Sequence, residues 1–466
     1  MKNIEIKISV LVYVLNDASH IEKSVRSVME QTLQELEILL IDGGSTDGTL
    51  EKLEQLRDED KRIRLIRSTA GVGCQFNTGL RAAAGKYIGI CESDDYILPD
   101  MYERQYEVAE KYDLDVVKAN VLRFCESDGE EYSFPFSLSA DQKLFDILLY
   151  PRKDPRFLKL GVNGFWSGLY RREFLTGNGL WMNETEGASY QDITFSFLTE
   201  LYARRAYVMP EAFYCYRMDN PDSSINNPRK TTLLHTEYRL LKEQLKQRKL
   251  WKQSKEIYWR WRMDSCFWCY DNLSDTMRAE YIPLLYQDIR NEMGAEAYDG
   301  TELTVREKAL CMAVEDSWET FQNFMAETDI EWQQMAQKIS MLTPKEDVVI
   351  FGTGNLGVLV NEYLKYNGKA AVAGIDNNSG KWNRRIGGLM ILMPAEGVKK
   401  YPNAIYIIAN AVHADDMCEQ LVQLGIREEQ IIVCKNYDLF LKKMLINKIK
   451  GKGSVKNTSK AAKDTA

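Results

Sequence analysis

The sequence predicts an α/β protein in which two parallel-sheet units flank a helical region. Over the first 120 residues, β-rich apolar runs alternate with segments patterned as helices. A second alternation starts with a Gly-rich turn near residue 350, and the stretch 230–341 between the two holds a single proline, Pro283. Alternation of this kind is typical of parallel strands connected by crossover helices.

The elements of the first unit follow from its apolar patterning. The expected strands are Ile8–Leu15, Leu36–Ile41, Ile63–Ile66 and Lys86–Cys91. Apolar residues spaced three and four positions apart predict helices near 21–29, 50–56 and 75–84. Beyond Asn120 the pattern is looser but still reads as α/β to about Ile225. The alternation over the first 120 residues therefore predicts parallel strands for that part of the unit.

Changes in composition set the expected domain boundaries. We expect an α/β domain at 1–226, a helical domain at 227–345, a second α/β domain at 346–438 and a basic, disordered tail at 439–466. The tail carries eight lysines and one acidic residue, whereas the whole chain has a net charge of −8. A solvated end is the simpler interpretation of the tail. The alternative is weak attraction to an anionic membrane surface.

Composition excludes several classes of protein. The 466 residues are 45% hydrophobic and 27% charged, which is ordinary for globular domains and unlike collagen or a wholly disordered chain. The acidic balance argues against nucleic acid as the main partner. We see no signal peptide and no run of about 18 apolar residues that could span a membrane. Nine cysteines, an odd number, suit reduced thiols, so we expect a cytoplasmic protein, peripheral at the inner face of the membrane if the tail binds there.

Aromatic and cysteine clusters in the helical region are predicted to be core. Cys266 and Cys269 form the single C-x-x-C pair, and three histidines in the whole chain make a zinc site a poor alternative. Aromatic residues at helical spacing, in Tyr258–Trp261 and Phe267–Tyr270, more often pack inside a protein than bind sugar. Stacking on an acceptor saccharide remains the alternative for these aromatic residues.

Acidic residues follow two of the expected strands. Asp42 and Asp47 come after the second strand, and Glu92, Asp94 and Asp95 come after the fourth. Parallel strands bring these clusters to the same edge of the sheet, where ligands bind in open α/β folds. Neighbouring carboxylates repel each other unless a cation or donors lie between them. The pattern therefore indicates a Mg²⁺ or Mn²⁺ site for a diphosphate, with plain turn and cap residues as the alternative.

These clusters belong to a longer series of motifs. The segments are Ile8–Asn16, Ile38–Thr49 (ILLIDGGSTDGT), Gly85–Asp95 (GKYIGICESDD), Phe165–Phe174 (FWSGLYRREF), Gly187–Phe197 (GASYQDITFSF) and Phe213–Ile225 (FYCYRMDNPDSSI). In order and spacing they resemble the inverting glycosyltransferases of family 2, which have the GT-A fold. The resemblance covers the chain to about residue 226 and implies a nucleotide-diphospho-sugar transferase domain.

The resemblance implies a donor site for a nucleoside-diphosphate sugar. In it Asp42 hydrogen-bonds the base, most often uracil, so a UDP-sugar is favoured. The other donor-binding residues that the resemblance implies are Tyr13, Asn16, Asn77 and Glu92.

The resemblance also implies the catalytic groups. Asp94, with Asp95 or Glu92 beside it, holds the Mg²⁺ or Mn²⁺ that bridges the diphosphate, and Asp192 is the base. A carboxylate can take the proton of an attacking hydroxyl, and a cation offsets charge on the leaving diphosphate. One base and one leaving group give a single displacement with inversion. The alternative for Asp192 is a cap on an expected helix at 193–201.

Several positions depart from the family pattern, among them Gln191, which stands where the family usually has an acidic residue. Leu15 replaces an aromatic residue, which leaves base stacking open, and Gly43 replaces the second Asp of a usual pair. Phe76 stands where the family has Arg, which removes a phosphate contact, and Glu92 stands where it prefers Asp. Neither Asp94 nor Asp192 is affected, so we expect activity.

The second α/β domain carries a dinucleotide-binding fingerprint. Gly352, Gly354 and Gly357 follow the expected strand Val348–Phe351, and Asp376 comes 19 residues after the last glycine. Such glycines let a pyrophosphate approach a helix N-terminus, and the acid can meet a ribose hydroxyl. The alternative is that the glycines serve only the turn and its packing. The unit resembles small Rossmann-like modules of surface-sugar transferases, and its length suggests one mononucleotide-binding half.

We therefore predict a cytoplasmic, metal-dependent glycosyltransferase. It would move a sugar to a saccharide or lipid-linked acceptor in bacterial surface-polysaccharide assembly. One rival is a nucleotide-cofactor oxidoreductase or epimerase run by the C-terminal unit. The other is a scaffold that binds without catalysis.

Overall fold

The computed structural model describes two compact units of the chain. The described residues are 5–127, 130–139, 141–154, 156–160, 164–220, 230–295, 299–343, 345–366, 368–410 and 413–434. Unit 1 comprises Met1–Cys125 and Phe136–Ser265, and unit 2 comprises Glu126–Pro135 and Cys266–Ala466. The basic tail at 439–466 lies outside the described residues, as do the expected domain boundaries at 226 and 438.

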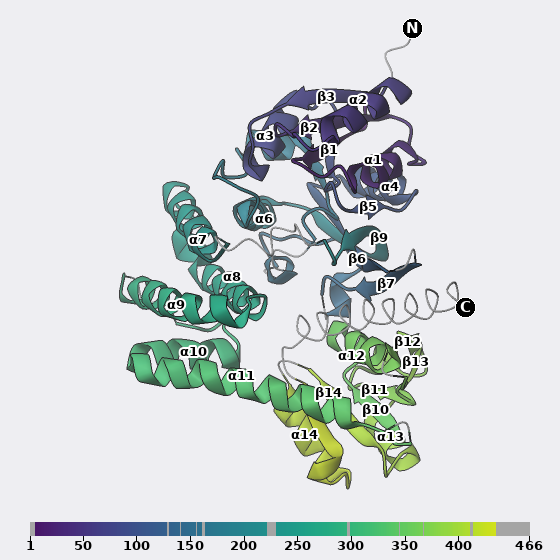
Figure 1. Ribbon diagram of the computed structural model, residues 1–466, viewed down its shortest axis with the longest axis vertical. Coiled ribbons are helices and arrows are strands. Elements are labelled where there is room, and N and C mark those ends of the chain that lie inside the picture. Colours follow the sequence, from purple (N-terminus) through teal and green to yellow (C-terminus); the bar gives the residue numbers. More distant parts are fainter. Residues whose placement is uncertain are drawn as a thin grey trace, which may run out of the picture. The chain divides into compact units, whose positions relative to one another are not determined.

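Unit 1 has strands and helices in the alternation expected from the sequence (Figure 1). Its strands are β1 (Ile8–Val14), β2 (Leu36–Asp42), β3 (Ile63–Arg67), β4 (Tyr87–Ile90), β5 (Tyr96–Ile97), β6 (Val116–Ser127), β8 (Leu169–Arg171) and β9 (Ala206–Arg217). Its helices are α1 (Ile21–Met29), α2 (Thr49–Glu59), α3 (Val72–Ala82), α4 (Met101–Tyr112), α5 (Arg172–Gly177), α6 (Gln191–Tyr202), α7 (Lys230–Gln247) and most of α8 (Trp251–Asp271). The α/β class is confirmed.

The four strands predicted from the first 120 residues pair in parallel as expected, but the sheet of unit 1 as a whole is mixed. Its strand order is β3-β2-β1-β4-β8-β6-β9-β5. The first four strands pair in parallel, but β8 is antiparallel to both β4 and β6, and β5 is antiparallel to β9. The predicted parallel part is therefore the half of the sheet formed by β1 to β4. The antiparallel strands β5 and β8 are two and three residues long and leave no periodic signal in the sequence.

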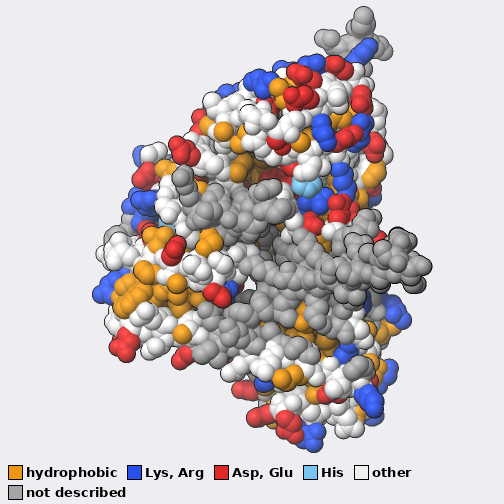
Figure 2. Space-filling model, in the orientation of Figure 1, with side chains coloured by type: hydrophobic (Ala, Val, Ile, Leu, Met, Phe, Trp, Pro, Cys, Tyr) orange, Lys and Arg blue, Asp and Glu red, His pale blue; other side chains and the backbone are white. Residues whose placement is uncertain are grey.

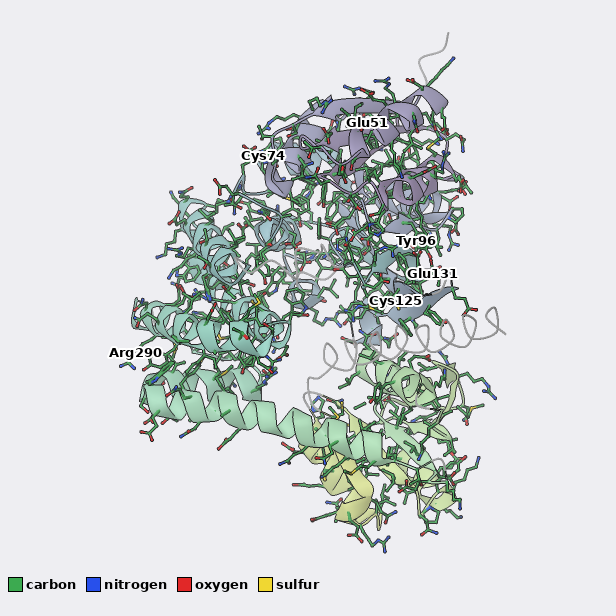
Figure 3. The ribbon with its side chains drawn as sticks, viewed as in Figure 1. Glu51, Cys74, Tyr96, Cys125, Glu131 and Arg290 are labelled. Carbon is green, nitrogen blue, oxygen red and sulfur yellow. The ribbon has the colours of Figure 1, made fainter. Side chains whose placement is uncertain are left out.

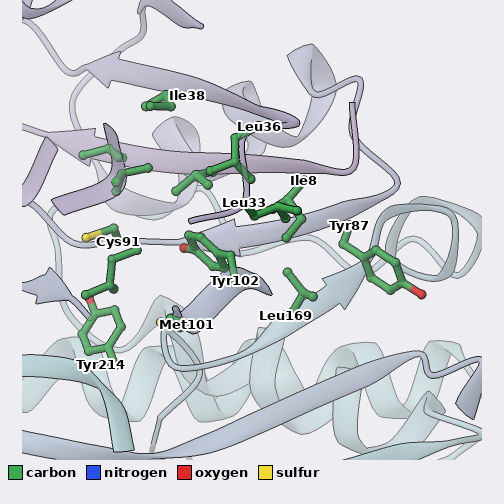
Figure 4. Packing of buried hydrophobic residues seen from close by; sticks show 14 of the residues in the cluster. Ile8, Leu33, Leu36, Ile38, Tyr87, Cys91, Met101, Tyr102, Leu169 and Tyr214 are labelled. Carbon is green, nitrogen blue, oxygen red and sulfur yellow. The ribbon is translucent and has the colours of Figure 1, made fainter. Parts of the chain in front are cut away.

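The centre of this sheet is buried on both faces. Every residue of β1 and β2 is buried, which explains why their sequences are nearly continuous apolar runs. Leu33, Leu36 and Ile38 pack in one cluster with Tyr102 of α4 and with Leu169 of β8 (Figure 4). This packed layer gives the loops at the strand ends a rigid base.

The helical region contains the aromatic residues as core. Tyr258, Trp259 and Trp261 of α8 are at most 2% exposed, and Cys266 and Cys269 are buried. All nine cysteines fall within the described ranges as free thiols, and Cys74 on α3 is labelled in Figure 3. The prediction that these clusters are core is confirmed.

Unit 2 holds the rest of the helical region and the second sheet. The strands of the second sheet are β10 (Val348–Phe351), β11 (Ala373–Ile375), β12 (Arg385–Ile386), β13 (Leu389–Leu392), β14 (Ile405–Ala409) and β15 (Ile431–Cys434), and β7 (Glu130–Phe136) is not part of this sheet. The helices of unit 2 are α9 (Asp275–Ala295), α10 (Val305–Asp316), α11 (Trp318–Met341), α12 (Asn355–Tyr366), α13 (Pro394–Lys400) and α14 (Ala414–Gln423). Hydrophobic side chains gather over α9 and α10 on the face seen in Figure 2.

The second sheet is larger than the single mononucleotide-binding half we predicted. Its order is β12-β13-β11-β10-β14-β15, and all strands except β12 run parallel. In chain order the parallel strands lie 3-2-1-4-5, which is the doubly wound arrangement with its switch point between β10 and β14. Strands of three to five residues make this compact enough for a unit of about 90 residues.

The described helices of both units share one further property. None of them is both long enough and apolar enough to cross a membrane.

Candidate functional site

The candidate site lies in unit 1, where three parallel strands end at one edge of the sheet. Val14 pairs with Asp42 across β1 and β2, and Leu11 pairs with Ile90 across β1 and β4. The loops after these strands therefore lie side by side. This carboxyl edge is where ligands bind in open α/β sheets. The two acidic clusters share it, as parallel pairing requires.

Asp42 ends β2 and organises the turn that follows. Its buried carboxylate accepts hydrogen bonds from the backbone amides of Gly44 at 3.2 Å and Ser45 at 3.1 Å. Arg67 at the end of β3 donates a 2.7 Å bond to Oδ2 of the same group. Oδ1 accepts only the Ser45 bond among the described contacts, and the side chain has no exposed surface. The contact with a nucleotide base stays a prediction.

Asn16 faces the same turn from the loop after β1. Its side-chain Oδ1 accepts from the backbone amide of Thr46 at 2.8 Å, and its backbone amide donates to the hydroxyl of Ser45 at 2.9 Å. Its φ of 53° is left-handed, a conformation that Asn tolerates better than most residues. Leu15 beside it is 42% exposed. Asn16 thus shapes the rim of the site, and its contact with a donor stays a prediction.

Tyr13 joins β1 to the acidic loop after β4. Its hydroxyl donates to Oε1 of Glu92 at 3.0 Å, and the hydroxyl of Tyr214 accepts from the amide of Glu92 at 2.9 Å. Burial raises the pKa of Glu92, and the charges of Asp94 and Asp192 raise that pKa further. Glu92 is therefore in electrostatic range of both the predicted metal residue and the predicted base.

Asp94 and Asp95 differ in their surroundings. Asp94 is half-buried, and its Oδ2 accepts from the amide side chain of Asn220 at 2.8 Å. Asp95 is 1% exposed, and its Oδ1 accepts from the backbone amide of Arg217 at 2.7 Å. Burial raises the pKa of both carboxyls. Asp94 is thus the better placed to meet a ligand, while Asp95 ties the loop to β9. The metal roles of both stay predictions.

Asp192 lies in the first turn of α6. The helix begins at Gln191 and its N-cap is Tyr190, so the alternative that Asp192 is the cap is wrong. The amides of Asp192 and Ile193 hydrogen-bond its carboxylate, but burial is the larger effect and raises its pKa to about 6. A carboxyl group at a helix N-terminus with this pKa is ionised near neutral pH and can still accept a proton.

The loop before α6 is held by α3. Asn77 is 2% exposed, and its Nδ2 donates to the carbonyl of Met182 at 2.9 Å and to Oε1 of Glu184 at 3.0 Å. Its Oδ1 accepts from the amide of Met182 at 3.1 Å. A Cβ on Gly73 would lie 1.9 Å from the carbonyl oxygen of Asn183, so only glycine fits at this contact. Both polar atoms of Asn77 are used inside the protein, and its donor contact stays a prediction.

Phe76 has a packing role in place of the missing phosphate contact. Its buried ring meets Phe195 of α6 edge to face, with 4.9 Å between centroids. Such aromatic pairs contribute beyond their buried area. The departure from the family pattern at Phe76 therefore supports the helix that carries the predicted base.

Glu237 on α7 is a site residue that the sequence did not indicate. Asn183 donates to Oε1 of Glu237 at 2.6 Å and to the hydroxyl of Thr194 at 3.0 Å. Gln244, about two turns further along the same face of α7, donates to Asn183 at 2.9 Å. Burial raises the pKa of Glu237 to about 7, with the charge of Asp192 adding to the effect. α7 lies beyond every motif, so no local signal could have found this contact.

Asp17 and Ser93 are further residues that sequence reasoning missed. The hydroxyl of Ser93 donates to Oδ2 of Asp17 at 2.7 Å, and Oδ1 of Asp17 lies 2.6 Å from Nδ1 of His20. Asp17 follows the first strand directly, at the same edge as the acidic loop. This position in the sequence, just after the first strand, could have indicated that Asp17 lies near the site.

The donor groups of this edge suit a hard cation shared with a ligand. Within the described ranges no group of three or more His, Cys, Asp and Glu side chains is arranged to hold a metal. Mg²⁺ is usually held by one or two carboxylates, with waters and substrate phosphates completing its shell. Asp94 and Glu92 are two partly exposed carboxylates on one loop, which is the donor set that such a site needs.

In unit 2 the glycines of the predicted fingerprint have unequal roles. A Cβ on Gly357 would lie 2.1 Å from the carbonyl oxygen of Gly352. A Cβ on Gly352, whose φ is 94°, would lie 2.7 Å from the carbonyl oxygen of Ala409. A Cβ on Gly354 would meet nothing within 4 Å. Packing alone therefore accounts for Gly352 and Gly357 but leaves Gly354 unexplained.

Asp376 is engaged inside unit 2. Its Oδ2 accepts from the amide of Thr353 at 2.9 Å, from the hydroxyl of Thr353 at 2.7 Å and from Nζ of Lys381 at 2.9 Å. Its Oδ1 accepts from the amide of Asn378 at 2.9 Å. Although burial opposes ionisation, these bonds lower its pKa. A ribose contact stays a prediction and would have to compete with these partners.

Comparison with known proteins places these features in a family. Residues 9–176 match glycosyl transferase family 2, and residues 344–432 match a family described as C2185-like, N-terminal. The uncharacterized glycosyltransferase EpsJ of Bacillus subtilis is 30% identical over 231 residues, which are 48% of this chain and 65% of EpsJ. The uncharacterized glycosyltransferase YibD of Escherichia coli is 28% identical over the same length, again 65% of the relative. The chain thus spans just under two thirds of these relatives.

A solved structure shares the fold. The S. aureus protein TarS, residues 1–349 in complex with UDP-GlcNAc, superposes with a TM-score of 0.51 at 17% identity. The match covers 70% of this chain and 92% of that structure. Together with the strand order and the motif residues at its carboxyl edge, these matches assign the fold as GT-A. Residues 9–176 of this chain are thus similar to glycosyl transferase family 2.

Proposed function

We propose that unit 1 is an inverting glycosyltransferase that moves a sugar from a nucleoside-diphosphate sugar, with a UDP-sugar favoured, to an acceptor hydroxyl. The observation that carries the proposal is Asp192, a carboxyl group with its pKa raised to about 6 in electrostatic range of Glu92. A base beside a loop suited to a diphosphate is the minimum that a single displacement needs.

The chemistry assigns one step to Asp192. Its ionised carboxylate accepts the proton of the acceptor hydroxyl while the hydroxyl oxygen bonds to the anomeric carbon. The bond from that carbon to the diphosphate oxygen breaks in the same step, and the nucleoside diphosphate leaves with the electron pair. Attack from the face opposite the leaving group inverts the anomeric configuration. No second carboxylate has to act as a nucleophile, in contrast to retaining glycosidases.

The remaining residues bind and orient the donor. Asp42 and Asn16 line the rim for the base and ribose, and Tyr13 holds the carboxylate of Glu92 in place. Asp94 and Glu92 would hold Mg²⁺ or Mn²⁺. A cation bound there supplies positive charge that stabilises the leaving diphosphate.

The wider role is a further part of the proposal. The acceptor is a saccharide or lipid-linked glycan in bacterial surface-polysaccharide assembly, and the protein works in the cytoplasm with peripheral membrane contact through residues 439–466. The presence of UDP-GlcNAc in the TarS structure makes N-acetylglucosamine the first donor sugar to test.

The proposal is tested with the full chain and a panel of nucleotide sugars that starts with UDP-GlcNAc. We expect nucleoside diphosphate release that requires Mn²⁺ or Mg²⁺, and a thermal shift with UDP and metal. A chain that releases no diphosphate from any donor and shows no shift with any nucleoside diphosphate would overturn the proposal. Turnover of a nicotinamide cofactor instead would favour the oxidoreductase alternative.

A further inference from the structure

A hydrogen-bond network ties the loop after β1 to the acidic loop after β4. Ser93 donates its hydroxyl to Oδ2 of Asp17 at 2.7 Å, and Nδ1 of His20 lies 2.6 Å from Oδ1 of Asp17. The hydroxyl of Ser19 lies 3.1 Å from the same ring nitrogen. The two ends of the Asp17–Ser93 bond are 76 residues apart in sequence, so the bond is a tertiary connection and not part of either turn.

Asp17 is itself held from several sides. Its amide donates to the hydroxyl of Thr49 at 2.9 Å, and its carbonyl accepts from the amide of Ile21 at 3.1 Å, where α1 begins. Its side chain is 13% exposed. A carboxylate with this many fixed partners keeps one orientation, which is what a supporting group for a binding site requires.

Ser93 lies between Glu92 and Asp94, the two acidic residues proposed to hold the cation. Fixing its side chain restricts the backbone that carries Glu92 on one side and Asp94 on the other. Asp94 is also held by the 2.8 Å bond from Asn220. The network and Asn220 therefore hold the acidic loop from two sides.

The charge of Asp17 acts on Asp94 as well. The bond from Ser93 brings the carboxylate of Asp17 next to the loop that carries Asp94, so two carboxylates lie close to each other there. A neutral amide could accept the Ser93 hydroxyl without this repulsion between carboxylates. A carboxylate at this place makes physical sense where a cation offsets both charges.

We propose that Asp17, oriented by His20, is a positioning residue that sets Asp94 for the donor diphosphate and its cation by holding the hydroxyl of Ser93. This inference rests on the function proposed above and extends its site to Asp17 and His20, which lie outside the family motifs. Asp17 acts through Ser93 and through its charge, not by contact with the reacting atoms.

The test uses UDP with Mn²⁺ as the probe and calorimetry as the measurement. We expect Ser93→Ala to weaken UDP binding in saturating Mn²⁺ about tenfold, as loss of one hydrogen bond to a charged group implies. Ser93→Thr keeps the hydroxyl and should restore binding to within about threefold. The matched control is Thr32→Ala, which also removes a 2.7 Å hydroxyl–carboxylate bond, to Glu103, away from the site.

Asp17→Asn separates the charge from the hydrogen bond. It keeps an acceptor for Ser93, so we expect the Mn²⁺ concentration for half-maximal UDP binding to rise about fivefold, with UDP affinity at saturating Mn²⁺ nearly restored. A structural role alone predicts that all these variants lose thermal stability as Thr32→Ala does and bind UDP and Mn²⁺ like the wild type; that result would overturn the inference. A wild-type chain that binds no UDP would instead overturn the proposed function, and this inference with it.

Discussion

The hydroxyl of Tyr13, near the end of β1, donates a 3.0 Å hydrogen bond to Oε1 of Glu92 in the loop after β4. The bond links two strand ends that are 79 residues apart in sequence. It also favours the ionised form of a carboxyl group whose pKa is raised by burial and by Asp94. The bond therefore controls both the position and the charge of the acidic loop.

Tyr13→Phe should weaken binding of UDP with Mn²⁺. Loss of the donor raises the pKa of Glu92 further and leaves less negative charge for the cation, so we expect the dissociation constant, measured by calorimetry at pH 7, to rise roughly tenfold. Tyr87→Phe is the matched control, because Tyr87 donates a 2.8 Å bond to Glu110 far from the site. Equal UDP affinities for the two variants would show that the Tyr13 bond serves packing alone.

Asp192→Asn should abolish transfer but preserve UDP binding. An amide cannot accept the proton of the acceptor hydroxyl, and loss of such a base typically costs about 10²–10⁴-fold in rate. In the wild type, kcat should fall as pH drops through about 6, because the pKa of the folded carboxyl is raised to that value and the protonated form is inactive. A variant with measurable transfer and an unchanged pH profile would exclude Asp192 as the base.

Glu92→Gln should stabilise the protein in the absence of ligand. Burial raises the pKa of Glu92 in the folded state. The unfolded chain therefore ionises first, and wild-type stability falls as pH rises from about 4.3 through the folded pKa. The amide removes this loss of stability. At pH 8 the variant should therefore melt at a higher temperature than the wild type, by roughly 2–4 °C for each 1 kcal/mol of stability regained. At pH 4 the variant and the wild type should melt at the same temperature.

Glu35→Gln is the control for this change. The hydrogen bond from Lys7 lowers the pKa of Glu35, so its substitution should give no gain in melting temperature at pH 8. With UDP and Mn²⁺ present, the wild type should melt at a higher temperature than Glu92→Gln, because the ligand stabilises the wild type more than it stabilises this variant. If Glu92→Gln and the wild type melt together at pH 8, the buried charge carries no cost.

The parts of the fold that could be predicted are those with a strong local pattern. β1 and β2 are buried on both faces, so their apolar runs are long and uninterrupted. The two residues of β5 and the three of β8 are too few to show a period, and pairing with distant β9 and β6 makes them strands. The mixed character of the sheet was therefore out of reach from one sequence.

In the candidate site, too, only residues within a local sequence pattern could be predicted. Asp94 and Asp192 stand in motifs, whereas Glu237 enters through α7, which the motifs do not cover. Asp376 shows the opposite case: it has the spacing of a ribose ligand, yet Thr353 and Lys381 take up its carboxylate. Spacing indicates which residues can meet, but competition among side chains for hydrogen bonds is decided only in the folded structure.

Gly357→Ala and Gly354→Ala should separate packing from ligand binding in unit 2. The Cβ of Gly357→Ala would lie 2.1 Å from a backbone oxygen that cannot turn aside, so this variant should destabilise unit 2 by roughly 1–3 kcal/mol or more in denaturant unfolding. Gly354→Ala meets no atom within 4 Å and should leave stability within about 0.5 kcal/mol of the wild type. If the turn also binds a pyrophosphate, the single substitution Gly354→Ala should abolish a thermal shift caused by NAD or UDP at this unit. The pyrophosphate can approach the backbone closely only where the residue has no side chain. A stable Gly354→Ala variant whose shift is unchanged would establish that the glycines serve only the turn.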